Sequence, residues 1–445
     1  MYSAQDNIVA LATIPGKSAL NVIRCSGQSC LLLYKKLFKQ KKDPKPNYVQ
    51  LRTAFFDGKI IDKCMVTFYK NPKSYTGENM LEISSHGGSV IAMKIIQAIE
   101  SMSFRSASPG EFTYRSFING KMNLAQAEFV QTAIDSKNSL DSFFSIKNIE
   151  GAFSAQVDNI SSEIKSILTY MEHELDFNES EIEFETQEAY IKKINKAIGL
   201  IEKTKKLSYM ANDNKSSVLI SLVGKTNVGK SSLFNKILGY ERSIVTNKKG
   251  TTRDTVEADF IINNINVKLV DTAGIRKTKE IVEKEGISRT YKTIQNSDIV
   301  IFVDDSSPIK NILPFSKIIQ NKKTLLVKSK SDLKGYKKEK NALSVSSKSE
   351  EGLKTLINKL NKEVAQYKEK FIDNYMFLIN NRQRNILNSA SKHLKDALVS
   401  YKNTNDIVVL SSYLRTAYEK LCEIQGYKDK DEIINTIFKG FCVGK

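Results

Sequence analysis

The chain has 445 residues, 41% of them hydrophobic and 26% charged, an ordinary globular composition with room for about two to four domains. No apolar run approaches the ~18 residues of a membrane span, and the first 12 residues lack the basic start and apolar centre of a signal peptide. Five cysteines without a C-x-x-C pair or a histidine cluster argue against a disulfide framework and a zinc site. We therefore expect a protein of the reducing cytoplasm that makes no membrane contact.

The net charge of +19 invites an acidic partner such as RNA and also suits a nucleotide-binding protein. Lysines are spread over the whole chain, however, so a general preference for lysine gives the same sum, and charge alone leaves RNA contact open. Two basic runs, 35–45 and 322–340, are interpreted as solvated loops or helix faces, whereas residues 172–188 are strongly acidic.

Residues 1–120 mix short strands with helices and predict a small α+β domain. A helix is predicted over 89–99, where apolar residues three apart share one side. Strands are predicted, by β-branched content and partial alternation, at 7–12, 20–24, 64–69 and 80–83.

From residue 121 to 214 the apolar period is helical, with a long stripe between Phe153 and Leu175. After residue 369 the helical period returns in two stripes, 386–398 and 410–424. These last ~70 residues are few for a stable hydrophobic core of their own, so we expect them to pack on the first helical part.

Residues 215–368 alternate strands and helices, the pattern of a parallel sheet with crossover helices. The predicted chain is multidomain α/β, with this third part inserted into the helical domain. The predicted boundaries are 1–120, 121–214, 215–368 and 369–445.

A short apolar strand, 218–223, leads into a G-x-x-x-x-G-K-S motif at 224–231, and apolar residues then recur at helical spacing. Strand, glycine-rich loop and helix are together the context of a P-loop. Its backbone N–H groups and the helix N-terminus attract phosphate. Lys230 reaches the β- and γ-phosphates, and Ser231 holds Mg²⁺ through its hydroxyl.

Two later segments predict the switch regions of a Ras-like GTPase. Residues 246–254 form a loop with Thr251 and Thr252, which suits closure onto Mg²⁺ and the γ-phosphate. An apolar strand then ends in Asp271-Thr272-Ala273-Gly274, about 40 residues after the P-loop, which is the GTPase spacing.

The guanine-reading element should be Asn-Lys-x-Asp after an apolar strand. The chain offers Ser329, Lys330 and Asp332, so one bracing hydrogen bond is in doubt where serine replaces asparagine. The Asp332 carboxylate can accept from the guanine N1–H and amine, which adenine cannot supply, so we expect a preference for GTP. Residues 345–348 suit the last base-contacting loop.

Ras-like enzymes carry a water-orienting glutamine after D-T-A-G, but this chain has Ile275, which cannot orient water. Glu283 and Glu285 are available instead. Asn227 in the P-loop could coordinate a monovalent cation in place of an arginine finger.

In these motifs the chain closely resembles the family of tRNA uridine-5-carboxymethylaminomethyl modification GTPases, MnmE/TrmE, and the resemblance covers nearly all 445 residues. The further matching motifs are Asp6-Asn7-Ile8-Val9-Ala10, Tyr75-Thr76-Gly77-Glu78, Ser85-His86-Gly87-Gly88, Pro109-Gly110-Glu111-Phe112-Thr113, Asn123-Leu124-Ala125-Gln126-Ala127-Glu128 and Phe441-Cys442-Val443-Gly444-Lys445.

The resemblance implies a K⁺-activated GTPase that works with an FAD-dependent partner subunit. Together they add a carboxymethylaminomethyl group to position 5 of the wobble uridine of certain tRNAs. A tetrahydrofolate derivative, 5-formyl- or 5,10-methylene-tetrahydrofolate, supplies the one-carbon unit. The N-terminal domain is then expected to dimerise and to bind folate through Arg24, Glu82, Lys121 and Lys445.

The resemblance also implies the ion sites. Mg²⁺ falls to Ser231 and Thr252, and the catalytic groups are Lys230 and the water-orienting Glu283. The implied K⁺ ligands are Asn227, Thr246, Lys248 and Thr251. The predicted GTP-binding set is Asn227, Val228, Gly229, Lys230, Ser231, Ser232, Thr246, Asn247, Lys248, Lys249, Gly250, Thr251, Thr252, Asp271, Thr272, Ala273, Gly274, Ser329, Lys330, Asp332, Ser346, Ser347 and Lys348.

Two other functions stay open. A ribosome-assembly GTPase that binds rRNA shares the P-loop and D-T-A-G, but it lacks the folate-type domain and the F-C-V-G-K end. The second is a conformational switch without a one-carbon role. The presence of the implied folate contacts argues against it: Arg24, Glu82, Lys121 and Lys445. Cys442 is either a nucleophile or a packing residue of the tail, and the sequence identifies no neighbouring base.

Overall fold

The computed structural model describes residues 6–136, 138–176, 185–210, 217–240, 256–271, 291, 293–320, 322–427, 437, 438, 440, 441 and 444. The chain divides into two compact units. Unit 1 consists of Met1–Ile134, Ile146–Thr204 and Asn381–Lys445, and unit 2 of Asp135–Ser145 and Lys205–Asn380. Among the described residues, none of the helices combines the length and the apolar character that a membrane crossing requires.

Unit 1 begins with six strands. Their bounds are β1 Ile8–Leu11, β2 Leu20–Ser26, β3 Val49–Phe56, β4 Lys59–Tyr69, β5 Met80–His86 and β6 Arg105–Ser106. They form one sheet in the order β3-β4-β5-β2-β1-β6. Neighbours are antiparallel except β1 and β6, which are parallel.

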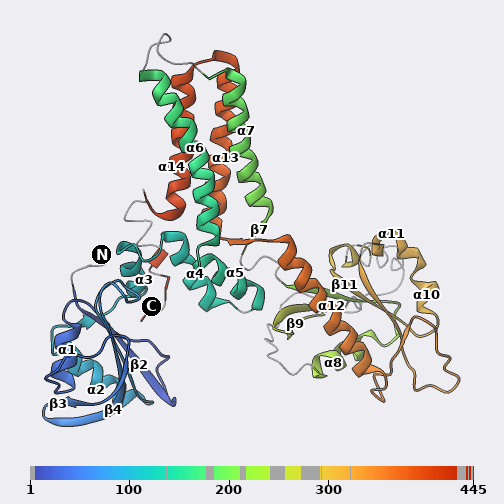
Figure 1. Cartoon of the computed structure of the whole chain (residues 1–445). Coiled ribbons are helices and arrows are strands. Elements are labelled where there is room, and N and C mark those ends of the chain that lie inside the picture. Colours follow the sequence, from blue (N-terminus) through green and yellow to red (C-terminus); the bar gives the residue numbers. More distant parts are fainter. Residues whose placement is uncertain are drawn as a thin grey trace. The chain divides into compact units, whose positions relative to one another are not determined.

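Two helices, α1 Cys30–Leu37 and α2 Ser89–Glu100, cover one face of this sheet (Figure 1). Their apolar sides and alternate strand residues form one core, in which Ile23 and Ile95 have no exposed surface. The alternate residues point to the opposite face because side chains of a strand alternate. On that face Leu20, Leu51 and Met65 are 57%, 59% and 47% exposed.

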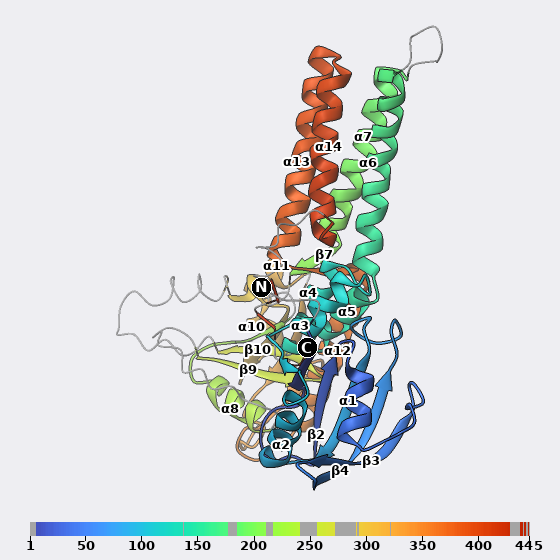
Figure 2. The same cartoon turned by 90° about the vertical axis from the view of Figure 1, so that its left-hand side faces the viewer.

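The rest of unit 1 is helical. The helices that follow the sheet are α3 Glu111–Ile118, α4 Leu124–Asp135, α5 Ser139–Ile149, α6 Ala152–Asp176, α7 Gln187–Lys206, α13 Asn381–Thr404 and α14 Ile407–Gln425. Three of them cross into unit 2: α4 and α7 end there and α5 begins there. The long helices α6, α7, α13 and α14 lie side by side in both views (Figures 1 and 2).

Contacts between early and late helices build one core in this bundle. The predicted stripe of α6 is buried from Phe153 to Met171, but its last residue, Leu175, is 47% exposed. Gln425 of α14 donates to the Asp158 carboxylate of α6 at 2.8 Å. The C-terminal helices therefore pack on the first helical part, as the sequence predicts.

Local signals explain where α14 begins and ends. The Asp406 carboxylate accepts hydrogen bonds from the backbone N–H groups of Val408 and Val409 at 2.9 and 3.1 Å, which satisfies two free donors of the first turn. At the other end Gly426 has a φ of 84°, the left-handed conformation in which helices commonly stop.

Unit 2 contains a second six-stranded sheet. Its strands are β8 Val218–Val223, β9 Val256–Ile262, β10 Ile265–Asp271, β11 Ile299–Asp304, β12 Lys323–Lys328 and β13 Leu343–Ser344. The order is β13-β12-β11-β8-β10-β9, and all neighbours are parallel except β9 and β10. The carboxyl ends of parallel strands meet at one edge, where ligands of such sheets bind.

Helices cover both faces of this second sheet. On one face α8 Lys230–Tyr240 and α12 Leu353–Asn374 pack on the strands through a single core. On the other face the described residues include the helical stretch 293–296, with buried Ile294, and the short elements α10 Pro308–Asn311, the 3₁₀ turn η2 Leu313–Phe315 and α11 Ser316–Ile319. Near the two ends of its long segment, Lys205–Asn380, lie β7 Ser208–Met210 and β14 Phe377–Ile379, which pair in parallel.

The structure adds elements to residues 1–120 that the sequence did not predict. Helix α1 spans only 8 residues and contains a continuous apolar run, so no helical period is visible in it. Strand β3 lies at the edge of the sheet and carries Gln50, Arg52 and Thr53 among its residues, which hides its alternation.

Candidate nucleotide-binding site

The loop between β8 and α8 carries the G-x-x-x-x-G-K-S motif. Gly224 leaves the strand with a φ of 153°, and a Cβ placed on it would lie only 2.0 Å from the carbonyl oxygen of Val303, so the position requires glycine. Asn227 and Gly229 follow with φ values of 63° and 95°. The loop therefore curls directly ahead of the N-terminus of α8, where backbone N–H groups attract phosphate.

Lys230 opens helix α8 and is only 4% exposed. Its ammonium donates to the carbonyl oxygen of Gly224 at 2.8 Å and to that of Lys225. Burial lowers the pKa of Lys230, and the Asp271 carboxylate, which raises it, offsets this only in part. A buried ammonium with only neutral hydrogen-bond partners gains when an anionic phosphate comes within reach.

Ser231 and Asp271 bring two oxygen ligands together. The Ser231 hydroxyl donates to Oδ2 of Asp271 at 2.9 Å, and Asp271 is 1% exposed at the carboxyl end of β10. A hydroxyl and a carboxylate beside a phosphate-binding loop are the donor set that Mg²⁺ uses in such sites. The residues present therefore fit Mg²⁺.

Ser329 connects the guanine-reading loop to the P-loop. It follows β12, is 7% exposed, and its hydroxyl donates to the carbonyl oxygen of Val228 at 2.7 Å. Its backbone N–H donates to the carbonyl of Asp304 at 2.9 Å. The bracing hydrogen bond that the sequence left in doubt is thus made by the shorter serine side chain.

Asp332 presents its carboxylate in a fixed orientation. Its Oδ1 accepts from the Ser346 hydroxyl at 2.6 Å, and this hydrogen bond, the largest cause, lowers the pKa of Asp332. Ser346 in turn accepts from the backbone N–H groups of Lys348 and Ser349, both at 3.1 Å. The loop that carries Ser346 therefore holds the Asp332 carboxylate, the predicted acceptor for guanine, ionised and in place.

Lys330 has a partner that the sequence analysis missed. Its ammonium lies 2.5 Å from Oδ2 of Asp305, directly after β11. Asp305 comes one residue after β11, whose own last residue, Asp304, occupies the position that Asp271 has in β10, and a carboxylate directly after a buried strand was the available signal. The ion pair keeps the Lys330 side chain beside the loop that also carries Asp332.

We expect Ser329→Ala to weaken GTP binding about three- to tenfold. The change removes a hydrogen bond and leaves the buried Val228 carbonyl without this donor, a loss of about 1 kcal/mol. GTP should still be preferred to ATP because Asp332 is intact. Competition binding with both nucleotides measures this, and Ser331→Ala, whose hydroxyl makes only a 3.4 Å contact to Glu351, is the matched control. An unchanged GTP affinity in Ser329→Ala would contradict the bracing role.

Several predicted site residues lie outside the described residues. They are Thr246, Asn247, Lys248, Lys249, Gly250, Thr251, Thr252, Thr272, Ala273, Gly274, Ile275, Glu283 and Glu285. Their roles stay predictions. Of the four predicted K⁺ ligands, Asn227 is described and lies exposed in the P-loop.

A second cluster lies on the open face of the unit 1 sheet. Arg24 and Glu82 are paired residues of β2 and β5, and their side chains form an ion pair at 2.7 Å. Oε2 of Glu82 also accepts from the Tyr69 hydroxyl at 3.2 Å, and the Arg24 guanidinium donates to the carbonyl of Gly444 at 3.3 Å. Both side chains are 27% exposed, so a ligand can reach them.

The other two predicted folate contacts stand differently. The Lys121 ammonium donates to the carbonyl oxygen of Pro72 at 3.1 Å. Lys445 lies outside the described residues, as does Cys442. Tyr69 was not predicted for this cluster, and burial, followed by the Glu82 carboxylate, raises its pKa.

Two family models match the chain. Residues 7–121 match the N-terminus of the GTP-binding protein TrmE, and residues 124–442 match the MnmE helical domain. The tRNA modification GTPase MnmE of Aquifex aeolicus is 35% identical over 99% of this chain and 100% of its own length. The chain belongs to the MnmE family.

Other members of the MnmE family match equally far along the chain. The tRNA modification GTPase MnmE of Thermotoga maritima is 36% identical, with 99% of this chain and 100% of that protein covered. That of Mycoplasma genitalium is also 36% identical, over 99% of both. Among solved structures, the G domain of the Thermotoga maritima FeoB iron transporter is 27% identical and covers 34% of this chain and 99% of its own, with a TM-score of 0.26.

Both clusters lie inside segments that match MnmE family models. Arg24, Glu82 and Lys121 fall within the match to the N-terminal domain, and the P-loop and guanine-reading loop fall within residues 124–442. The family recognised from sequence motifs is thereby confirmed.

Proposed function

We propose that this chain hydrolyses GTP as a component of a tRNA-modifying complex. The observation that carries the proposal is the convergence, at one edge of the unit 2 sheet, of Lys230, the Ser231–Asp271 pair and Asp332. These groups suit the phosphates, Mg²⁺ and the guanine base in that order. Membership of a family of tRNA modification GTPases supports the direction of the chemistry.

The finer proposal concerns the modification itself. With an FAD-dependent partner subunit, the chain would add a carboxymethylaminomethyl group to position 5 of the wobble uridine of certain tRNAs. The Arg24–Glu82 pair supports a tetrahydrofolate derivative as the one-carbon donor. Arg24 can pair with folate carboxylates, and Glu82 can accept hydrogen bonds from the pterin ring.

The same sheet face supports a homodimer formed through the N-terminal domain. Leu20, Leu51 and Met65 are about half exposed there, although they are large and apolar. Exposed apolar side chains grouped on one face are typical of an interface between subunits. We place the complex in the cytoplasm, and we keep the domain limits 1–120, 121–214, 215–368 and 369–445.

For hydrolysis we propose activation by K⁺. In that proposal Asn227, Thr246, Lys248 and Thr251 hold the ion, and Glu283 orients water because Ile275 cannot. Asn227 supports it, since its exposed place in the P-loop suits a ligand that faces a bound nucleotide. Ser231 and Thr252 would hold Mg²⁺, with Asp271 beside them.

The modification claim is tested in cells that lack this chain. Nucleoside analysis of their tRNA should show loss of the 5-carboxymethylaminomethyl group from the wobble uridine, and return of the group on complementation. An unchanged wobble uridine would refute the modification claim. If ribosome assembly were impaired at the same time, the rRNA-binding alternative would replace it.

The cation claim is tested by comparing GTP hydrolysis by the full chain in KCl and in NaCl at equal ionic strength. We expect hydrolysis at least about tenfold faster in KCl, since a bound cation does the work of an arginine finger. Asn227→Ala should remove the difference while GTP still binds. Equal, slow hydrolysis in both salts would rule out K⁺ activation.

A further inference from the structure

A strongly basic segment of unit 1 takes no part in either site. Residues 35–56 contain six lysines and Arg52 but a single acidic residue, Asp43. This short stretch therefore carries a net charge of +6 out of the chain's +19. It comprises the last turn of α1, the following loop and β3.

The cations of this segment have few carboxylate partners. Lys35 pairs with Asp43 at 2.7 Å. Lys41 and Lys42 extend from the exposed loop between α1 and β3. Arg52 donates to neutral groups, namely the Tyr34 hydroxyl and the Leu51 carbonyl at 2.8 Å each and the Gln50 side-chain oxygen. Positive charge that is not compensated locally attracts an anionic partner.

Two lysines lie over aromatic rings. Nζ of Lys39 is 4.2 Å from the ring centre of Phe55, and Nζ of Lys45 is 4.9 Å from that of Tyr48. Tyr48 is 57% exposed, so a partner can reach it from solvent. Basic groups interleaved with accessible aromatic rings are typical of surfaces that bind single-stranded nucleic acid.

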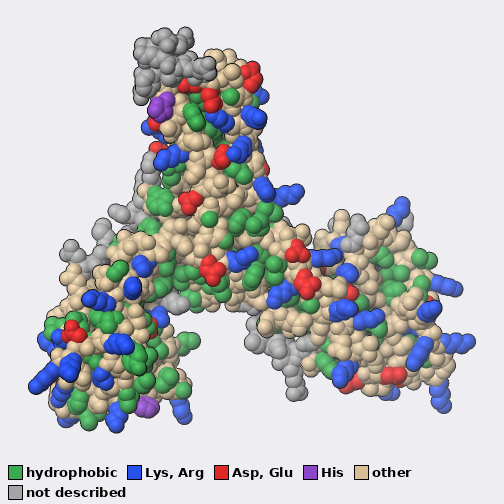
Figure 3. Space-filling model, in the orientation of Figure 1, with side chains coloured by type: hydrophobic (Ala, Val, Ile, Leu, Met, Phe, Trp, Pro, Cys, Tyr) green, Lys and Arg blue, Asp and Glu red, His purple; other side chains and the backbone are tan. Residues whose placement is uncertain are grey.

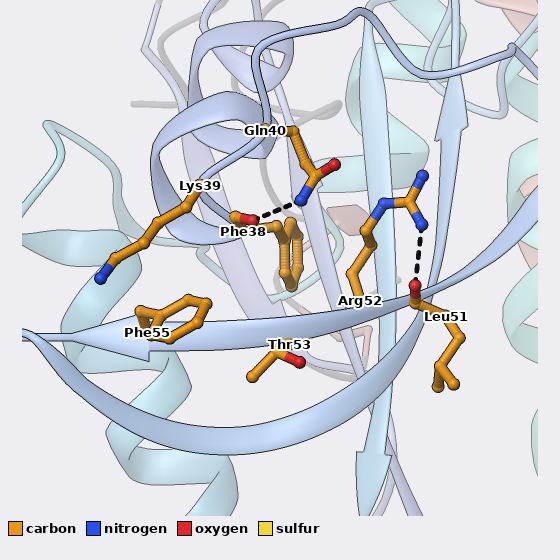
Figure 4. A pocket seen from close by; sticks show the side chains of 7 residues that line it. All are labelled: Phe38, Lys39, Gln40, Leu51, Arg52, Thr53 and Phe55. Carbon is orange, nitrogen blue, oxygen red and sulfur yellow. Dashed lines mark hydrogen bonds between the residues drawn. The ribbon is translucent and has the colours of Figure 1, made fainter.

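The segment also has a shape that can receive a chain. A hollow beside β3 is lined by Phe38, Lys39, Gln40, Leu51, Arg52, Thr53 and Phe55 (Figure 4). Lys39 extends across Phe55 at one side of it and Arg52 rises from β3 at the other. Tyr48 lies three residues before Leu51, which is about 10 Å along an extended backbone and comparable to the reach of one or two nucleotides.

The second basic run, 322–340, is a weaker candidate. Several of its lysines are engaged with their own unit: Lys322 with the carbonyls of Gln295 and Ser297, Lys323 with Glu363, and Lys330 with Asp305. That run also contains the guanine-reading residues. None of the roles described above uses the positive charge of residues 35–56.

We infer that residues 35–56 form a tRNA-binding surface that holds the sugar–phosphate backbone through its lysines and Arg52 and stacks an unpaired base on Tyr48. Figure 3 shows Lys and Arg side chains gathered over the part of the molecule built from α1, β3 and β4. The inference rests on the proposed function, since it locates the tRNA contact of a tRNA-modifying GTPase. An acidic protein surface would use the charge but would have no use for the exposed ring.

The test measures binding of the full chain to a fluorescein-labelled, unmodified tRNA transcript with uridine at the wobble position. Anisotropy is recorded between about 50 and 200 mM KCl. The variant K39Q/K41Q/K42Q/K45Q should bind at least about tenfold more weakly, and its slope of log K against log salt should fall by about 3, since four phosphate contacts are lost. K39R/K41R/K42R/K45R should restore both values.

The matched control is K334Q/K337Q/K338Q/K340Q, which removes the same charge from exposed positions of unit 2. It should change tRNA affinity less than about twofold. Equal losses in the two glutamine variants would mean diffuse charge and would overturn the inference. Unchanged binding by the 35–56 variant would overturn it as well. GTP hydrolysis by each variant checks that the chain is folded, because neither set contains a residue of the nucleotide site.

Tyr48 separates RNA from other acidic partners. Y48L should weaken binding of the transcript about tenfold through lost stacking, without a change in the salt slope, and Y48F should bind as the parent chain does. If Y48L bound normally while the lysine variant lost only self-association or a protein partner, the surface would belong to that protein.

Binding of the parent chain to the transcript is scored apart from wobble modification. Without binding the inference fails although the proposed function can stand; with binding but an unmodified wobble uridine the inference stands and the function fails.

Discussion

Lys230→Ala is expected to reduce kcat/KM for GTP hydrolysis at least a hundredfold, about the loss seen when one preorganised donor to developing charge is removed. The Lys230 ammonium is almost fully buried and donates only to loop carbonyls, Gly224 and Lys225, in the described structure. A phosphate that enters the loop provides the anionic acceptor that this group lacks. Steady-state hydrolysis with saturating Mg²⁺ measures the effect.

The control for Lys230→Ala is Lys236→Ala on the same helix. Lys236 is exposed and pairs with Glu350 at 2.5 Å, an exposed ion pair that contributes little to stability. It should hydrolyse GTP within about twofold of the parent chain. Both variants should unfold at similar temperatures. Lys230→Ala loses two hydrogen bonds of the ammonium, but it also removes the cost of burying a charge, and the two effects offset each other. Hydrolysis by Lys230→Ala at the parent rate would contradict the assigned role of this ammonium.

The nucleotide site could be read from the sequence wherever its parts are local. A P-loop is eight consecutive residues between a strand and a helix, so Lys230 and Ser231 can be identified from the sequence alone. The Ser231–Asp271 contact required only the knowledge that parallel strands end at one edge. The hydrogen bond from Ser329 to Val228 could not be predicted from the sequence. The two residues are 101 positions apart, and the short serine side chain reaches the Val228 carbonyl only when the end of β12 lies at the right distance from the P-loop.

The cluster of Arg24 and Glu82 shows the same limit in another form. Arg24 and Glu82 look like ordinary strand residues until the pairing of β2 with β5 sets them opposite each other, 58 positions apart. A shift of that register by one residue would send one of them to the helix-covered face. The basic run 35–45 was visible as charge, but its extension to residue 56, with Tyr48 and Phe55, depends on an edge strand that the sequence did not predict.

Gly224→Ala is expected to abolish nucleotide binding and to destabilise unit 2 by about 3 kcal/mol or more, which is the range of severe backbone and packing changes. The added methyl would lie 2.0 Å from the Val303 carbonyl oxygen, a backbone atom of the neighbouring strand β11 that cannot rotate away. The φ of 153° is itself unfavourable for alanine. The P-loop must therefore move, and the loop that moves is the one that holds phosphate.

Gly239→Ala tests whether that effect is specific to Gly224 or a general cost of changing a glycine in this part of unit 2. Gly239 lies in α8, and a Cβ added there meets no atom within 4 Å. Alanine favours a helix over glycine by about 1 kcal/mol, so this variant should melt slightly higher and bind GTP normally. Thermal unfolding should therefore show a lower melting temperature for Gly224→Ala and a slightly higher one for Gly239→Ala. GTP titration should show binding only for Gly239→Ala. Similar losses in both variants would contradict the prediction, because the close approach of Gly224 to Val303 would then not account for the effect.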